Sequence, residues 1–166
     1  MPHITKATKE DCGFILKCIK DLAEFEKAPK EVIVTKEQLE KDGFDEPRRF
    51  EAFIAWEDDE PAAMALYYHR YSTWKGLSLY LEDLYVEPKF RKRGLANLLM
   101  RTLCVEALER GCGRFEWQVL DWNQGAIDFY KSMGATLDPE WLNCRMVPEN
   151  ITAWLQRVGD PPKRSN

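Results

Sequence analysis

The chain has 166 residues, 45% of them hydrophobic and 31% charged, which is typical of one globular domain with a single core. No apolar run approaches the roughly 20 residues that cross a bilayer, so a membrane anchor is not expected. The formal net charge of −4 disfavours a general nucleic-acid binder and favours a cationic ligand.

Cysteine and histidine content limits the chemistry further. Five cysteines without a C-x-x-C pair predict reduced thiols. The two histidines, His3 and His69, are too few for a His-rich metal site and give a Cys/His nucleophile little support. The N-terminus has no apolar segment after a basic stretch, so we expect no secretory signal and a cytosolic location.

The first half of the chain predicts two helices and then a meander of strands. A capping box at Thr8 precedes apolar residues at helical spacing over 11–26, and Thr35 starts a shorter helix that stops near Gly43. Three β-rich runs separated by short turns then favour antiparallel neighbours, at 50–56, 61–70 and 77–86.

The second half predicts alternating helices and strands. A helix runs from Leu95 to Arg110, with Gly111 placed as a left-handed C-cap residue. The next elements are a strand, a helix that ends at Gly134 and a last strand, at 114–121, 125–133 and 141–147. Strand, helix, strand in this order predicts a parallel pair beside the meander, hence an α/β (α+β) domain over 1–158 with a mixed sheet. A disordered tail is expected over 159–166.

A basic turn lies between the 77–86 run and the next helix. Its pattern R-x-x-G-x-A spans Arg91 to Ala96, where unpaired amides of the first helical turn could converge on a phosphate. It lacks the Walker and Rossmann glycine patterns, which disfavours ATP and NAD. A solvated patch of charge is the alternative interpretation.

Two motifs resemble one known family. The R/Q-x-x-G-x-G/A turn between a strand and an amphipathic helix resembles the pyrophosphate loop of the Gcn5-related N-acetyltransferase (GNAT) family, which uses acetyl-CoA, and the segment LDWNQGAIDFYKSMGA (120–135) resembles its second CoA-contacting segment. The stretches YSTWKG, LYLEDLYV and VLDWNQ resemble the diamine and thialysine acetyltransferase branch. Ala96 replaces the commoner second glycine, and the segment from Gly134 to Trp141 is short for the branch.

The resemblance implies a fold in which the sheet splits after LEDLYV and acetyl-CoA lies in the split. Main chain at the strand end would pair with pantetheine, the basic turn would hold the pyrophosphate, and the second segment would bracket the arm. The implied acetyl-CoA residues are Leu84, Tyr85, Val86, Arg91, Lys92, Arg93, Gly94, Leu95, Ala96, Asn97, Asn123, Gln124, Gly125, Ala126 and Tyr130. Asn123 could equally be a plain N-cap of the following helix.

Acetyl transfer needs a neutral amine, and deprotonating a lysine-like ammonium at pH 7 costs roughly 4.6 kcal/mol. Glu82 and Asp83 are adjacent on a predicted strand, so we expect them to point to opposite faces, with only one in the cleft. By resemblance Glu82 is the base, acting through water and attracting the cationic substrate. The alternative is that either carboxylate lies on the sheet surface.

Tyr130 is, by resemblance, the acid for the departing CoA thiolate. A phenol titrates near 10 and a thiol near 8.5, so full proton transfer is uphill by roughly 2 kcal/mol and a hydrogen bond could be its main contribution. Tyr130 also shares a helical face with apolar neighbours, which is typical of a core residue. Direct attack in a ternary complex is expected.

The amine pocket is the least constrained part of the prediction. Ser72 stands where polyamine-specific members carry an acidic residue, which favours thialysine (S-(2-aminoethyl)-L-cysteine) or a lysine-like amine over diamines and polyamines. The other implied substrate residues are Phe25, Glu26, Glu82, Glu116, Trp117, Gln118 and Glu140. The branch also implies a homodimer. A silent acyl-CoA-binding module and a peptide acetyltransferase are the rival interpretations.

Overall fold

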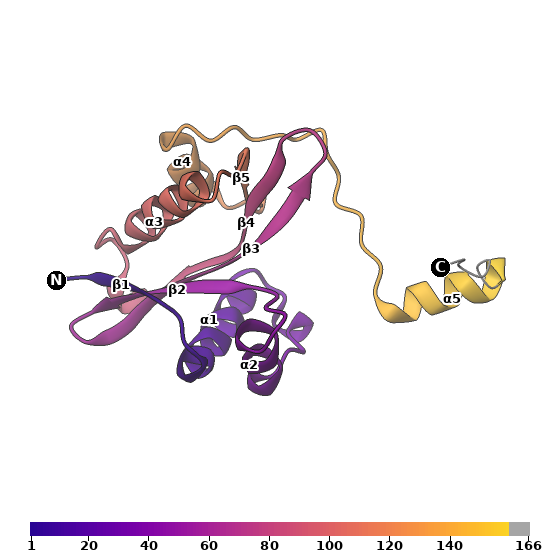
Figure 1. Cartoon of the computed structure of the whole chain (residues 1–166), viewed down its shortest axis with the longest axis horizontal. Coiled ribbons are helices and arrows are strands. Elements are labelled where there is room, and N and C mark those ends of the chain that lie inside the picture. Colours follow the sequence, from indigo (N-terminus) through magenta and orange to yellow (C-terminus); the bar gives the residue numbers. More distant parts are fainter. Residues whose placement is uncertain (160–166) are drawn as a thin grey trace. The chain divides into compact units, whose positions relative to one another are not determined.

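The computed structural model describes residues 1–159 and contains five strands and five α-helices (Figure 1). The chain divides into one unit up to Asn123 and a second that begins at Gln124. The elements in order are β1 (His3–Lys6), α1 (Cys12–Phe25), α2 (Lys36–Phe44), β2 (Glu51–Glu57), β3 (Glu60–Ser72), β4 (Gly76–Val86), α3 (Leu95–Glu109), β5 (Arg114–Glu116), α4 (Gln124–Ser132) and α5 (Pro148–Val158).

The first unit is built on a mixed sheet in the order β1-β2-β3-β4-β5. The predicted meander is confirmed, because β2, β3 and β4 pair as antiparallel neighbours. A parallel pair beside the meander is confirmed, since β5 runs parallel to β4 across the crossover helix α3, but the run 141–147 adds no further parallel strand among residues 1–159. Helices α1 and α2 cover one face of this sheet, and α3 lies on the other (Figure 1).

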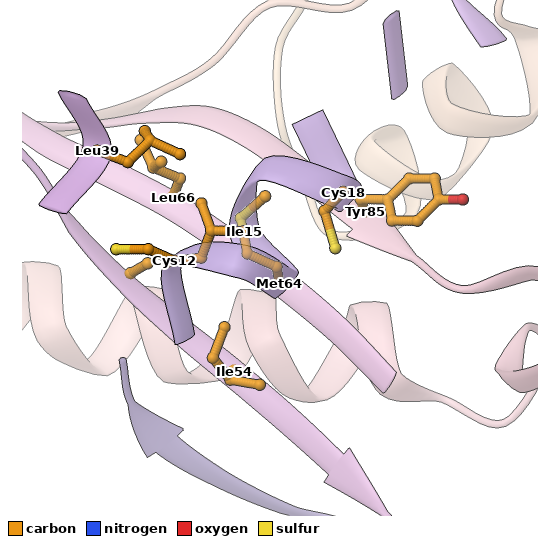
Figure 2. Packing of buried hydrophobic residues seen from close by; sticks show 9 residues of the cluster. Cys12, Ile15, Cys18, Leu39, Ile54, Met64, Leu66 and Tyr85 are labelled. Carbon is orange, nitrogen blue, oxygen red and sulfur yellow. The ribbon is translucent and has the colours of Figure 1, made fainter. Parts of the chain in front are cut away.

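The core between α1, α2 and the sheet forms because helical and strand periodicities bring apolar side chains to one interface. Ile15 and Cys18 of α1 are fully buried against alternate residues of the strands, among them Ile54 and Met64 (Figure 2). The ring of Tyr85 closes this cluster near Cys18, and its hydroxyl donates a hydrogen bond to Asp21 Oδ2 at 3.3 Å. This packing therefore determines which side chains of β4 point toward α1.

Helix starts and stops follow the local signals in the sequence. The Thr8 amide donates to Asp11 Oδ2 at 2.7 Å, which completes the predicted capping box, although a short 3-10 turn at Lys9–Asp11 precedes α1. Thr35 Oγ1 accepts the Gln38 amide at 3.2 Å at the start of α2. After α3, Gly111 has φ 67°, the left-handed conformation predicted for it.

Two predicted strands differ from the structure. The run 114–121 is paired only over Arg114–Glu116. The run 141–147 forms no strand, and no described strand pairs with it. A strand persists only where a neighbour takes its backbone hydrogen bonds, so β-rich composition predicts the tendency and not the pairing.

Two elements were not predicted. β1 pairs with β2 from His3↔Trp56 to Lys6↔Phe53 and is too short to show a period of its own. Helix α5 has Pro148 at its first position and exposed apolar residues at helical spacing, Ile151, Trp154, Leu155 and Val158. That spacing is a signal of a helix in the sequence itself.

The predicted tail lies outside the described residues, apart from Gly159. Within residues 1–159, no helix combines the length and the apolar character that crossing a bilayer requires.

Candidate acetyl-transfer site

A β-bulge in β4 shapes the candidate site. Leu66 of β3 pairs with Asp83, whereas the next residue, Tyr67, pairs with Leu81, so Glu82 is the extra residue of β4. Leu66 packs in the α1 cluster, which places its partner Asp83 on the α1 face. Tyr68, two residues after Leu66, shares that face, and its hydroxyl donates to Glu82 Oε2 at 2.9 Å.

Both carboxylates therefore lie on the α1 face, and the expectation that they point to opposite faces is wrong. Strict alternation holds only for a regular strand, whereas a bulge inserts one residue and shifts the following side chains by one position. The residue pattern of LYLEDLYV alone carries no sign of this shift.

The bulge also coincides with the split of the sheet. Pairing between β4 and β5 covers Ser78↔Arg114, Leu79↔Phe115 and Tyr80↔Glu116 and then stops. A bulge bends its strand and increases the local twist, which carries β4 away from a straight neighbour. The main chain of Leu81 to Val86, including the predicted pantetheine residues Leu84, Tyr85 and Val86, thus has β3 on one side and no described strand on the other.

The basic turn that follows β4 has the backbone of an anion cradle. Lys92 has φ 62° and Gly94 has φ 84°, so two left-handed residues precede the first turn of α3. A Cβ at Gly94 would meet no atom within 4 Å, so the glycine is required by its φ and not by crowding. The amides of Leu95, Ala96 and Asn97 are the unpaired donors of this helix start.

A pocket of about 260 Å³ opens at this helix start. Asn97, Leu98 and Arg101 follow Gly94 at intervals that place them on one side of α3. The pocket is lined by these four residues together with Pro2, Arg93 and Leu95. The turn, the open strand edge and the positive charge of the pocket fit a ligand with a pyrophosphate and an extended arm, such as CoA.

The three cations of the turn differ in their partners. Arg91 Nε donates to the Val86 carbonyl at 3.1 Å and its guanidinium lies 5.8 Å from the Tyr85 ring centre, which ties the turn to the end of β4. Arg93 pairs with Glu57 at 3.2 Å and lies over the Phe90 ring. Lys92 is exposed and has no ion pair among residues 1–159. Arg91 and Arg93 therefore shape the turn as well as charging it.

Asp83 has the most unusual acid-base environment of the candidate site. Burial, reinforced by the negative charges of Glu82 and Glu26, raises the pKa of Asp83 to about 7. Burial also raises the pKa of Glu26, which caps the C-terminus of α1. The sequence prediction admitted only one of the two carboxylates to the cleft and chose Glu82, because the burial of Asp83 depends on the bulge and on the end of α1.

Aromatic residues surround these carboxylates. The rings of Tyr68 and Tyr80 lie 5.3 Å apart, and Arg70 lies over Tyr80 at 5.0 Å. Burial and the hydrogen bond to Glu82 raise the pKa of Tyr68, so its phenol stays a donor. Glu116, opposite Tyr80, forms ion pairs with Arg114 at 3.0 Å and Arg70 at 3.7 Å. Glu116 is thus balanced by two cations, unlike Glu82 and Asp83.

The remaining predicted substrate residues of the first unit lie at its turns. Phe25, at the end of α1, packs against Trp122 with ring centres 5.6 Å apart and ring planes tilted by 46°. Trp117 contacts Phe115 at 4.8 Å and is followed by Gln118 beyond the end of β5. Ser72 Oγ accepts the amides of Trp74 and Lys75 at 3.2 and 3.1 Å, so its hydroxyl stabilises the β3–β4 turn.

The second unit carries the other predicted site residues. Tyr130 is buried on α4 beside Phe129, and burial raises the pKa of its phenol. Gln124, the first residue of α4, donates its side-chain amide to Asp128. Gly125 and Ala126 follow it in the first turn, and Asn123, the last residue of the first unit, directly precedes the helix. Glu140 is exposed and its amide donates to Asp138 Oδ1 at 3.0 Å.

Sequence reasoning gave no role to two residues of the candidate site, Arg101 in the pocket at the start of α3 and Asp83 on β4. The spacing of Arg101 from Gly94, two helical turns, could have identified it as a neighbour of the predicted phosphate turn. Asp83 had no comparable signal. Among residues 1–159, no group of three or more metal-ligating side chains is close enough to hold a metal ion.

Comparisons with known proteins identify relatives of this chain by sequence and by fold. The chain is 41% identical over 147 residues to a thialysine N-epsilon-acetyltransferase of Caenorhabditis elegans, covering 87% of this chain and 91% of that protein. It is 40% identical over 140 residues to the Bos taurus protein of the same name, covering 80% and 82%. An integron cassette protein from the V. cholerae mobile metagenome shares the fold, with a TM-score of 0.76 at 23% identity over 93% of this chain and 98% of that chain.

The family assignment follows from the open edge of β4, the glycine turn at α3 and these relatives together. The sequence profile of the acetyltransferase (GNAT) family matches residues 17–135, which include both of these features and α4. The chain therefore belongs to the GNAT acetyltransferase family.

Proposed function

We propose that this acetyltransferase transfers the acetyl group of acetyl-CoA to the side-chain amine of thialysine or a similar lysine-like substrate. The observation that carries the proposal is the pair of carboxylates Glu82 and Asp83 on the α1 face, with Glu26 at the end of α1 acting on Asp83, beside the point where β4 loses its partner. Such a set attracts a cationic amine to the strand edge that would hold the thioester. The names of the relatives at 40 and 41% identity support the same substrate.

Several residues would hold acetyl-CoA in this proposal. The amides at the start of α3 would bind its pyrophosphate, with Lys92 and Arg101 adding charge, and the free edge of Leu84 to Val86 would pair with the pantetheine arm. Bound acetyl-CoA supplies the activated thioester. Tyr130 would donate a hydrogen bond to the leaving sulfur. Because burial raises the pKa of Tyr130, complete proton transfer becomes less favourable, and the hydrogen bond is its main role.

A diamine or polyamine acetyltransferase is the second candidate, and the same carboxylates favour it. A polyamine carries a second ammonium at a distance, and Ser72, whose hydroxyl is engaged in the β3–β4 turn, offers no charge to bind it. Thialysine carries an α-carboxylate beside its second ammonium, which an acidic residue would repel and the uncharged Ser72 does not, so thialysine is placed first. We also propose that the active form is a homodimer.

The experiment that tests the proposal measures CoA release with acetyl-CoA in excess. Thialysine, lysine, putrescine, spermidine and a lysine-containing peptide serve as acceptors in parallel. We expect the highest kcat/KM with thialysine, lower values with putrescine and spermidine, and none with the peptide. A preference for spermidine would favour the second candidate. Acetyl-CoA binding by calorimetry without CoA release from any acceptor would indicate a silent binding module and would refute the proposal.

A further inference from the structure

Two carboxylates meet at the bulge of β4, and their surroundings differ. We propose that Asp83, and not Glu82, accepts the proton that the substrate ammonium must lose, while Glu82 binds that ammonium. This inference rests on the proposed amine acetyltransferase function. It begins from the bulge, which brings both side chains to the α1 face where a regular strand would admit one.

Glu82 is placed to bind a cation. Its side chain is exposed, and Oε2 accepts the hydrogen bond of the Tyr68 hydroxyl at 2.9 Å. This bond fixes the orientation of the carboxylate. Its other oxygen, Oε1, remains available for the N–H of an incoming ammonium. An exposed, oriented anion of this kind attracts a cation from solution.

Asp83 lies in a different environment on the same strand. It is half-buried and makes no hydrogen bond or ion pair with any residue from 1 to 159. The titratable groups that face it are Glu82 on β4 and, on α1, Glu26 and Cys18. Burial and the two carboxylates hold the pKa of Asp83 at about 7. Both of its protonation states are then populated near neutral pH.

A carboxyl group that is partly protonated near neutral pH can accept a proton from an alkyl ammonium. A carboxyl near 7 is closer to the ammonium value of about 10.4 than an ordinary carboxyl near 3.9, so proton transfer to it is less uphill. A positive charge arriving at Glu82 also reduces the repulsion that Asp83 experiences. Substrate binding therefore favours the carboxylate form of Asp83, which is the form that accepts a proton.

With this assignment, the protons of the acetyl-transfer reaction balance. The ammonium gives one proton to the Asp83 carboxylate, and the neutral amine nitrogen forms its bond to the acetyl carbon while the carbon–sulfur bond breaks. The second proton lost by that nitrogen ends on the sulfur, giving the thiol. Asp83 then releases its proton to water. Ammonium and thioester thus give amide, thiol and one proton.

Kinetics of two matched variants test the division of roles. For Asp83→Asn we expect kcat to fall at least about 100-fold and the acidic limb of the kcat/KM pH profile, near pH 7 in the wild type, to disappear. For Glu82→Gln we expect KM for the amine to rise about tenfold with kcat changed little. Its acidic limb should persist at lower pH, because one negative neighbour of Asp83 is gone. Asp83→Glu should recover part of kcat.

A direct titration supplies a readout that does not depend on turnover. Carbon-13 NMR of aspartate carboxyls in the wild type should show one resonance that titrates near pH 7 and is missing from Asp83→Asn. In Glu82→Gln the same resonance should titrate at lower pH. Calorimetry with acetyl-CoA should give unchanged affinity in both variants, since neither residue lies in the α3 turn and the edge of β4 would meet the pantetheine arm through main-chain atoms alone.

Two outcomes would overturn the inference. In one, Asp83→Asn keeps the acidic limb while Glu82→Gln loses it, which would assign the base to Glu82. In the other, no aspartate of the wild type titrates near pH 7. A wild type that releases no CoA with any amine would instead refute the proposed function, and the catalytic role of Asp83 with it, whatever the NMR titration shows.

Discussion

At the scale of single residues, the candidate site depends on a few positions with an unusual backbone conformation or an unusually buried polar group. Gly94 and Lys92 adopt left-handed backbone, Asp83 is a half-buried carboxyl without an ion pair among residues 1–159, and Tyr130 is a buried phenol. Gly94 and Tyr130 stood out in the sequence because each belongs to a motif. Asp83 did not, because its environment is made by residues distant in the chain.

Gly94→Ala should weaken both the fold and acetyl-CoA binding. An alanine at φ 84° costs about 1–2 kcal/mol of unfolding free energy, and relaxation of that strain would turn the α3 amides away from a common centre. Urea denaturation and calorimetry with acetyl-CoA measure the two effects. The control is Gly13→Ala in α1, where a Cβ has open space and no positive φ is needed. Equal affinity of Gly94→Ala and wild type for acetyl-CoA would contradict the proposal that the turn before α3 binds the pyrophosphate.

Tyr130→Phe tests the phenol without changing the ring. We expect kcat to fall about 100-fold with the KM for acetyl-CoA nearly unchanged, because the hydroxyl would act on the leaving sulfur and not on binding. Tyr71→Phe, at an exposed tyrosine of β3, is the control and should keep full activity. If Tyr130→Phe also keeps full activity, the residue is a core aromatic.

Asp83 also predicts a pH dependence of stability. Its pKa is raised in the folded state, so the folded protein binds the proton more tightly than the unfolded chain, and this contribution favours folding as pH falls from about 7 toward 4. Above pH 7 the buried charge is a full penalty. Asp83→Asn should therefore stabilise the protein at pH 8, by up to about 4 kcal/mol, and little at pH 4.

Thermal unfolding of wild type and Asp83→Asn at the two pH values measures this difference. Asp59→Asn, at an exposed turn residue, is the control and should give no pH-dependent change. A variant that is less stable than the wild type at pH 8 would show that the Asp83 carboxylate is stabilised by its surroundings.

At the scale of elements, the site is a consequence of how β4 meets its two neighbours. On one side, the pairing of β4 with β3 contains the bulge that brings Glu82 and Asp83 to the same face. On the other side, β5 pairs with β4 for only three residues. The order strand, basic turn, helix was predictable because each piece has a local signal. The length of β5 was not, because it depends on where β4 bends.

The start of β5 is fixed by a close backbone contact at Gly113. Its amide donates to the Leu77 carbonyl at 2.8 Å, and a Cβ there would lie 2.0 Å from the Lys75 carbonyl oxygen. Gly113→Ala should therefore push β5 away from β4 and lower the unfolding free energy by about 2 kcal/mol or more. Gly125→Ala, at an open helical position, should cost nothing. Equal urea midpoints for Gly113→Ala and wild type would contradict this contact.

At the scale of the whole molecule, the apolar surface of the second unit bears on assembly. Trp141 and Leu142 are 72% and 87% exposed, and Met146, Val147 and Trp154 are also exposed. Contiguous exposed apolar residues are typical of an interaction surface. The segment 141–147 was predicted as a strand and has no strand partner among residues 1–159, which fits pairing with a second copy.

The dimer prediction can be tested by light scattering after size exclusion. Wild-type protein should elute as a dimer, and the double variant Trp141→Glu, Leu142→Glu should elute as a monomer because two buried charges oppose association. Leu108→Glu is the control, since Leu108 on α3 is also highly exposed and should leave the dimer intact. A monomeric wild type at micromolar concentration would refute the dimer.

The sequence alone determined most of the elements, their order and the basic glycine turn before α3, because periodicity, caps and glycines act over a few neighbouring residues. Helices α1 to α4, the meander and the left-handed C-cap residue Gly111 were all readable in this way. Only the tertiary structure decided the bulge at Glu82, the burial of Asp83, the short β5 and the unpaired segment 141–147. Each of these features depends on which segment of the chain packs beside the residue in question. Hydrogen-bond register and burial are set by that packing and not by the local sequence.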